Sequence, residues 1–357
     1  MNKSEFLQYS KDRYLFLDGA TGTNLAKAGM PGGVCPEKWI CENPAAMLSF
    51  QEAYLEAGSN ILYAPTFGAN RIKLSEYGLE SEQGSLIRTL VGISKEAVRN
   101  SGKEALIAGD LTMTGKQLRP MGDLDPEDLI EVYREQIRLL EDAGCDILVV
   151  ETMMSLAESR CALIAAKEVT DLAVLVTLTF EESGRTLFGT DAKTAAIVCE
   201  SLGAAAVGVN CSTGPAKMEQ IVSDMASVTR IPIIAKPNAG LPKVDSEGKT
   251  YYDMTAAEFV SETELLANAG AYILGGCCGT DPDYIKGLSE KFGNAAPAKV
   301  SRRPEGYRYL TSERRALAFG LDERFIIVGE RINPTGKKAL QAELREGNTE
   351  RVLQFAT

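Results

Sequence analysis

The chain has 357 residues, of which 45% are apolar and 24% are charged, and its formal net charge is −11. This composition is typical of a soluble globular protein, and the length allows one large α/β barrel or two ordinary domains. The acidic balance argues against nucleic-acid partners and anionic membranes, because phosphate contacts require clustered Lys and Arg. No apolar run approaches the roughly 20 residues that span a bilayer, so we predict a cytoplasmic protein without membrane contact.

The sequence contains eight cysteines and no histidine. The absence of histidine excludes Ser-His-Asp and Cys-His mechanisms, histidine-ligated zinc and a histidine general base. In a cytoplasmic protein, eight cysteines favour free thiols or metal ligands over a disulfide framework. Any transition-metal site in this chain therefore has to use Cys, Asp or Glu as ligands.

Short apolar runs alternate with longer amphipathic stretches from residue 14 onward. The runs are rich in Val, Ile and Leu without strict alternation, which is typical of parallel strands covered on both faces. Eight strands are predicted in this way, at 14–19, 60–67, 105–111, 146–152, 173–180, 206–211, 231–238 and 271–277. Eight strand–helix units in about 280 residues predict an α/β fold of the (β/α)8 TIM barrel type.

The helices between these strands carry start and stop signals. Pro44 opens a helix that Gly58 ends, Pro126 opens another that Gly144 ends, and Pro282 opens the last one. Pro at the first helical position and Gly just past the end are the expected punctuation.

After residue 295 the composition changes. We predict a barrel domain over 1–295, a linker over 296–324, and the incomplete beginning of a second domain over 325–357. The last segment contains an apolar run at 324–329 that indicates one strand, followed by a loop and a helical tail. One strand and one helix cannot bury a core of their own, so the alternative is a tail that packs on the barrel.

Active sites in TIM barrels lie at the C-terminal ends of the strands. Polar or reactive residues occur at this end of every predicted strand, namely Asp18, Thr66, Asp110, Glu151, Thr179, Asn210 with Cys211, Asn238, and Cys277 with Cys278. For any single residue in this set, the polar start of a loop is an equally good explanation. The set as a whole predicts a functional face.

The hexapeptide Gly-Gly-Cys-Cys-Gly-Thr at 275–280 follows the eighth strand. Adjacent cysteines among three glycines are a poor packing solution, since Gly contributes no side chain and costs backbone entropy. We interpret Cys277 and Cys278, with Cys211 at the end of the sixth strand, as three thiolate ligands of a Zn²⁺ with an open fourth position. The alternatives are a redox disulfide between the vicinal pair and a Cys211 that is merely buried.

The remaining cysteines are assigned to small buried positions. Cys145 begins a strand, and Cys161 and Cys199 lie in helical patterns. Cys35 and Cys41 are the two to reconsider, because they lie in the long loop after the first strand, on the predicted functional face.

Three thiolates give a zinc site a net charge of about −1 and make the metal a weak Lewis acid. Such a site suits a substrate thiol, whose ordinary pKa near 8.5 it lowers. Asp18 and Glu151 are candidates to capture a substrate ammonium group, with helix capping or a salt bridge as the alternative for each. The glycines after Asp18 offer backbone N–H groups to a carboxylate. Together these features describe an amino-acid thiol.

The chain resembles the zinc-dependent homocysteine S-methyltransferases over residues 14–292, through the motifs LDGATGTNL (17–25), PTFGANRIKL (65–74), VETM (150–153), VGVNCSTGP (207–215), KPNAGLP (236–242) and GGCCGTDPDYI (275–285). The resemblance implies that Cys211, Cys277 and Cys278 are the zinc ligands and catalytic residues. It also implies an L-homocysteine site built from Asp18, Gly19, Ala20, Glu151 and Asn210.

The segment FIIVGERINPTGKK (325–338) resembles the start of the pterin-binding barrel that follows this domain in cobalamin-dependent methionine synthases. This implies methyl transfer to the homocysteine thiol, giving methionine, with methylcobalamin recharged from 5-methyltetrahydrofolate as donor. Nothing in the sequence resembles a cobalamin-binding module, so the corrinoid is expected on another domain or chain. Two alternatives stay open: a related enzyme that uses betaine, S-methylmethionine or another corrinoid or thiol, and a zinc-binding or redox-sensing module without enzymatic activity.

Overall fold

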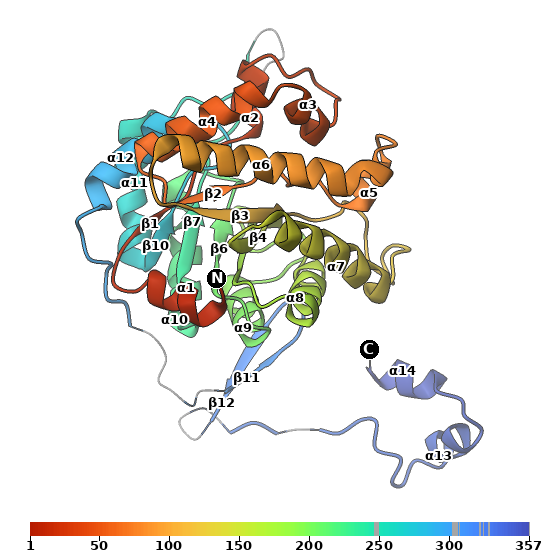
Figure 1. The fold of residues 1–357 in the computed structure, drawn as a ribbon. Helices are drawn as coiled ribbons and strands as arrows, with labels where there is room; N and C mark the ends of the chain where they lie inside the picture. The colour runs from red at the N-terminus through yellow and green to blue at the C-terminus, as the bar shows by residue number, and fades with distance from the viewer. Residues whose placement is uncertain are drawn as a thin grey trace. The chain divides into compact units, whose positions relative to one another are not determined.

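The computed structural model describes residues 1–245, 250–301, 306, 308–320, 323, 325–327 and 329–356. The chain divides into two compact units (Figure 1). The first comprises Met1–Gly306 and Thr311–Leu317, and the second comprises Tyr307–Leu310 and Ala318–Thr357. None of the described helices combines the length and apolarity needed to cross a bilayer.

An eight-stranded parallel sheet forms the centre of the first unit (Figure 1). Its order is β1-β10-β7-β6-β5-β4-β3-β2. The strands are β1 (Leu15–Phe16), β2 (Ile61–Tyr63), β3 (Leu106–Leu111), β4 (Ile147–Met153), β5 (Val174–Leu178), β6 (Ala206–Asn210), β7 (Ile233–Lys236) and β10 (Ala271–Leu274). The predicted eight-stranded barrel is confirmed. Most strands are shorter than predicted, because their polar C-terminal residues already turn into the loops.

Side chains help to close the ring between β1 and β2. The Asn60 N–H donates to the Phe16 carbonyl at 2.7 Å, and the Asn60 side-chain oxygen accepts from the Phe16 N–H at 2.9 Å. Two residues after Phe16, an Asp18 carboxylate oxygen accepts from the Tyr63 N–H at 2.8 Å. We call this junction the β1–β2 seam. It ties Asp18 into the barrel wall.

The helices of the first unit surround the sheet (Figure 1) and are α1 (Lys3–Tyr9), α2 (Gly22–Lys27), α3 (Pro36–Glu42), α4 (Pro44–Ala57), α5 (Arg71–Ser75), α6 (Gln83–Ser101), α7 (Pro126–Ala143), α8 (Leu156–Val169), α9 (Ala192–Ser201), α10 (Glu219–Val228), α11 (Ala256–Ala269) and α12 (Pro282–Phe292), with short 3-10 turns η1 (Glu80–Glu82) and η2 (Pro215–Met218). Helices α4 and α7 begin and end where the sequence predicts. Gly58 and Gly144 end them in the left-handed conformation, at φ 109° and 86°, which glycine adopts without steric cost.

The barrel interior is apolar at one end and polar at the other. Its apolar part includes Leu15, Ile61, Ile147 and Ile234, and Phe6 of α1 closes it at the N-terminal ends of the strands. At the C-terminal ends, the buried residues are instead polar or charged, among them Asp18, Asp110, Glu151, Asn210 and Lys236. Burying charged groups is costly unless they are paired, so this end of the barrel is the candidate functional end.

The segment that we expected to be a linker, 296–324, contains two strands, β11 (Arg308–Thr311) and β12 (Ala316–Phe319), which form a two-stranded sheet. These residues therefore have regular structure, which we did not expect, and the assignment of 296–324 as a linker between two domains stays a prediction. The Ser312 side chain accepts hydrogen bonds from the N–H groups of Arg314 and Arg315, and this tight turn is not evident from the Pro- and Arg-rich composition nearby.

The second unit contains α13 (Lys338–Arg345) and α14 (Glu350–Ala356). The strand predicted at 324–329 does not form at 325–327, and positions 324 and 328 lie outside the described residues. Phe325 and Ile327 are 90% and 85% exposed, so these two side chains are not packed in a core. Its assignment to a pterin-binding-like domain stays a prediction.

Candidate metal centre and substrate site

Three cysteines converge at the C-terminal ends of β6 and β10. The Sγ atoms of Cys211, Cys277 and Cys278 all lie within 4.8 Å of one another, and the described residues contain no second cluster of this kind. All eight cysteines are free. Three soft sulfur donors at this spacing fit a tetrahedral metal such as zinc and leave a fourth position open.

The backbone of Cys211 and Ser212 turns sharply out of β6. Both residues have positive φ, 63° and 67°, which for non-glycine residues costs of the order of 1–3 kcal/mol each. The Cys211 N–H donates to the Lys236 carbonyl at 3.1 Å, and the Cys211 carbonyl accepts from the Thr213 N–H at 2.8 Å. These bonds hold the strained turn that brings the Cys211 thiol toward the cysteines that follow β10.

Close packing explains the glycines around the cysteine pair, which corrects the interpretation made from the sequence. A Cβ on Gly275 would lie 2.7 Å from the Leu17 Cβ, and one on Gly276 would overlap the Thr280 side chain. Gly279 has φ 85°, and the ring of Tyr252 lies directly against it. The bare backbone lets three neighbours approach and so fixes where the two thiols stand.

Gly276→Ala is expected to lower metal affinity by about 10- to 100-fold, the range seen when groups that orient ligands are disturbed. The new Cβ would collide with Thr280 Cγ2 and Cβ at 2.7 Å and displace the adjacent Cys277. Competition with a chelator of known affinity measures the change. Gly92→Ala is the matched control, because Gly92 lies within α6 and a Cβ there would meet no atom within 4 Å. An unchanged affinity in Gly276→Ala would contradict the argument.

Asn210 and Tyr252 support the thiols. The Asn210 Nδ2 donates to Thr152 Oγ1 at 2.8 Å and reaches Cys277 Sγ at 3.9 Å, and its Oδ1 accepts from the Thr152 N–H at 3.0 Å. The Tyr252 hydroxyl hydrogen-bonds Cys278. Asn210 is fully buried and already bonded on both sides of its amide, so its contacts are those of a residue that positions Cys277. Its contact with substrate stays a prediction.

Asp18 and Glu151 meet at a buried lysine for which the sequence predicted no role. Lys236, the last residue of β7, places its Nζ 3.4 Å from Asp18 Oδ1 and 3.6 Å from Glu151 Oε2. The same ammonium lies 4.2 Å from the centroid of the Tyr63 ring. The signal that could have found Lys236 is a charged residue directly after the apolar run 233–235, before Pro237.

Burial has the largest single effect on the pKa values of Asp18, Asp110 and Lys236. It raises the pKa of Asp18 to about 6, although Lys236 and the Tyr63 N–H act in the opposite direction. Burial and the charge of Glu151 raise the pKa of Asp110 well above its ordinary value. For Lys236, burial opposes the charge, but Glu151 and Asp18 outweigh it and raise the pKa well above the ordinary value. The two carboxylates therefore favour the charged form of Lys236.

The loop after Asp18 is partly occupied by its own neighbours. The Ala20 N–H donates to Thr280 Oγ1 at 3.1 Å, and the Ala20 carbonyl accepts from the Tyr54 hydroxyl at 3.0 Å. A Cβ on Gly19 would lie 2.6 Å from that Tyr54 oxygen. A substrate carboxylate at this loop would thus compete with Thr280 for the Ala20 N–H, so the predicted role of Gly19 and Ala20 stays a prediction.

Cys35 and Cys41 do not join the metal cluster. Cys35 is buried beside α3, and its thiol donates to Glu37 Oε2 at 3.3 Å. Cys41 packs against the small apolar cluster that also contains Cys35. Burial raises the pKa of each thiol to about 11, which is the behaviour of small core residues.

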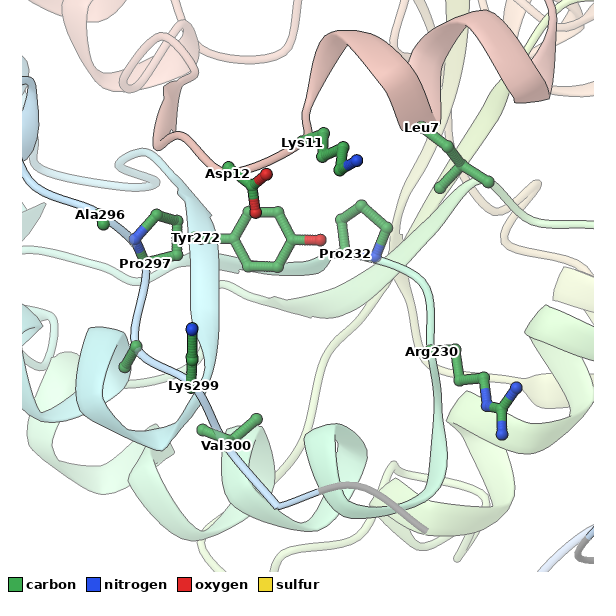
Figure 2. A pocket seen from close by; sticks show the side chains of 11 residues that line it. Leu7, Lys11, Asp12, Arg230, Pro232, Tyr272, Ala296, Pro297, Lys299 and Val300 are labelled. Carbon is green, nitrogen blue, oxygen red and sulfur yellow. The ribbon is translucent and has the colours of Figure 1, made fainter. Parts of the chain in front are cut away.

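A cavity of about 510 Å³ lies at the opposite end of the barrel (Figure 2). Pro232 and Tyr272, at the N-terminal ends of β7 and β10, line it together with Lys11, Asp12 and Lys299. Because it lies at the N-terminal ends of the strands, it is separate from the cysteine cluster.

Comparison with known proteins identifies the family of this chain. The family model for homocysteine S-methyltransferase matches residues 15–292. Methionine synthases from Mycobacterium leprae and Mycobacterium tuberculosis are each 26% identical over 99% of this chain, which spans 31% and 30% of their lengths. The homocysteine methyltransferase MmuM from Escherichia coli shares the fold: its metallated form superposes with a TM-score of 0.67 at 20% identity, over 80% of this chain and 98% of MmuM. The oxidised form gives 0.68 at 21% identity, over 82% and 100%. The chain belongs to the homocysteine S-methyltransferase family and is thus a member of a family of methyltransferases, as its motifs predict.

Proposed function

We propose that this chain accepts a methyl group onto the thiol of L-homocysteine, giving methionine, as the homocysteine-binding part of a methionine synthase. The observation that carries the proposal is the meeting of three thiols and a buried pair of carboxylates at one end of the barrel. The thiols suit the sulfur of the substrate, and the carboxylates suit its ammonium group. Family membership and the methionine synthase relatives support the same conclusion.

Cys211, Cys277 and Cys278 would hold zinc. The donor set fits, since three sulfurs within 4.8 Å of one another can share one tetrahedral ion. Zinc held there supplies a Lewis acid that lowers the pKa of the substrate thiol and leaves a nucleophilic sulfur at neutral pH.

The protein's own residues orient the substrate. Asp18 and Glu151 would bind the ammonium group, and the loop at Gly19 and Ala20 would face the carboxylate. Asn210 and Tyr252 hold Cys277 and Cys278 in place by hydrogen bonds. Fixing the thiol and the amino-acid head group together gives the sulfur one direction of attack, which is the positioning part of catalysis.

The rim around the site is suited to a large methyl donor. Exposed apolar side chains occur in several of the segments that follow the strands, namely Val34, Phe67, Met121, Leu187, Leu241 and Val244. Exposed apolar groups at the C-terminal ends of the strands would suit a binding surface. We propose methylcobalamin, carried by another domain or chain and recharged from 5-methyltetrahydrofolate, as donor, with a pterin-binding domain downstream.

The proposal predicts that the purified protein binds one zinc and that L-homocysteine adds one sulfur to its coordination shell. Zinc X-ray absorption with and without homocysteine measures this. Methyl transfer from methylcobalamin is expected to exceed transfer from betaine or S-methylmethionine. Zinc that gains no sulfur from homocysteine would refute the proposed substrate, and faster transfer from betaine or S-methylmethionine would refute the proposed donor.

A further inference from the structure

We propose that Lys236 is a positioning residue whose buried ammonium, lying between Asp18 and Glu151, holds these two carboxylates directed at the place that the α-ammonium group of the substrate takes. The inference rests on the proposed function, because it concerns the capture of homocysteine at the same site. It assigns a role to a residue that is not a ligand of the metal and, on this account, does not touch the reacting sulfur.

Lys236 is built into the floor of the site. Its side chain is 5% exposed, and its ammonium lies between Asp18 of the β1 end and Glu151 of β4, at 3.4 and 3.6 Å. The stem passes over Gly275, where a Cβ would lie 3.3 Å from Lys236 Cγ. The bare backbone of Gly275 thus leaves room for the lysine stem.

The two carboxylates retain open acceptor positions. Asp18 Oδ1 and Glu151 Oε2 are buried and have no hydrogen-bond partner among the described residues, although each faces Lys236 as an ion pair. Asp18 Oδ2 is used by the Tyr63 N–H. Buried acceptors are normally satisfied, so these two oxygens point to a ligand with N–H donors. An α-ammonium group carries three such donors.

The charges around Asp18 explain why a fixed cation is needed. Asp18 is faced by Glu151 from β4, Lys236 from β7, Tyr63 from β2 and Tyr54 from α4. Asp110 from β3 adds a third carboxylate to the group. Burial already raises the pKa of Asp18 to about 6 with Lys236 present. Without that cation the pKa would rise further, so that a larger fraction of Asp18 would be protonated and unable to hold an ammonium group.

The test is the pH dependence of homocysteine binding and turnover in Lys236→Met. In the unmodified protein the affinity should fall as the pH drops through about 6, where Asp18 takes up a proton. In Lys236→Met this midpoint should move up by at least about one pH unit, which weakens binding about 2-fold at pH 7 and about 10-fold well below pH 6. KM should rise while kcat at saturating homocysteine changes little. Lys236→Arg should restore the midpoint.

Lys291→Met is the matched control, because Lys291 pairs with Glu264 at 2.6 Å on the surface of α12. Metal content and circular dichroism establish that each variant is folded. If Lys236→Met does not fold, Lys236→Gln takes its place, since the amide offers N–H donors in place of the ammonium without the charge.

The outcomes separate the two proposals. If the unmodified protein does not bind homocysteine, the proposed function fails. If it binds homocysteine and the uncharged variant keeps the midpoint near pH 6, with affinity lowered equally at every pH, then Lys236 has a structural role and the inference is overturned. A midpoint that moves in Lys236→Arg as far as in Lys236→Met would overturn it as well.

Discussion

Cys211→Ala is expected to abolish stoichiometric metal binding and to lower kcat/KM for homocysteine by at least about 1,000-fold, or about 4 kcal/mol of transition-state stabilisation. Two thiols would remain, at Cys277 and Cys278, and they cannot by themselves hold a zinc ion with one open position. A metal that activates a nucleophile contributes several kcal/mol to catalysis, so its loss should dominate the kinetics.

Metal analysis after dialysis, together with methyl-transfer rates, measures both effects. Cys41→Ala is the matched control, since Cys41 is a half-buried thiol that packs on the apolar cluster around α3. It should retain the metal and most of the activity. A Cys211→Ala protein with a full complement of metal would show that the three cysteines are not the ligands.

Glu151→Gln is expected to raise KM for homocysteine by about 100-fold, with a much smaller effect on kcat. The substitution removes one of the two carboxylates that face Lys236. Under the proposed function, the substrate ammonium would then meet one carboxylate of the pair instead of two. Removing one partner of a buried charge interaction typically costs 2–5 kcal/mol, and 100-fold corresponds to about 2.7 kcal/mol.

A ligand without the amino group tests whether Glu151 acts by binding the ammonium group of the substrate. 4-Mercaptobutanoic acid lacks the α-ammonium, so its binding should be nearly the same in Glu151→Gln and in the unmodified protein. Glu131→Gln serves as a surface control, because Glu131 pairs with Arg134 at 2.7 Å on the exposed side of α7. If the affinities for homocysteine and for 4-mercaptobutanoic acid fall equally in Glu151→Gln, the carboxylate does not recognise the ammonium group.

The fold could be predicted because its signals are local. Runs of Val, Ile and Leu marked the eight strands, and Pro and Gly marked the ends of α4 and α7. The β11–β12 pair was missed because its turn depends on a single side chain, Ser312, whose hydrogen bonds leave no periodic pattern. The apolar run at 325–327 was predicted as a strand, but hydrophobicity does not supply a neighbouring strand or layer.

The sequence predicts the site residues whose chemistry is unusual. It does not predict those whose role depends on packing between distant segments of the chain. Paired cysteines and strand-end carboxylates are conspicuous in any sequence. Lys236 is not, because its burial depends on Gly275 and on acids from β1 and β4. The contact of Tyr252 with Gly279, and the bond from Ala20 to Thr280 across 260 residues, likewise arise only once the barrel has closed.

The two carboxylate oxygens of Asp18 have different environments at the β1–β2 seam. One of its oxygens joins β1 to β2 through the Tyr63 N–H, while the other is open toward Lys236. A ligand bound at the open oxygen would therefore act on the same carboxylate that joins β1 to β2. A substitution at Asp18 would weaken both the β1–β2 seam and the binding of the ligand. Glu151, whose Oε2 is open, takes no part in the seam.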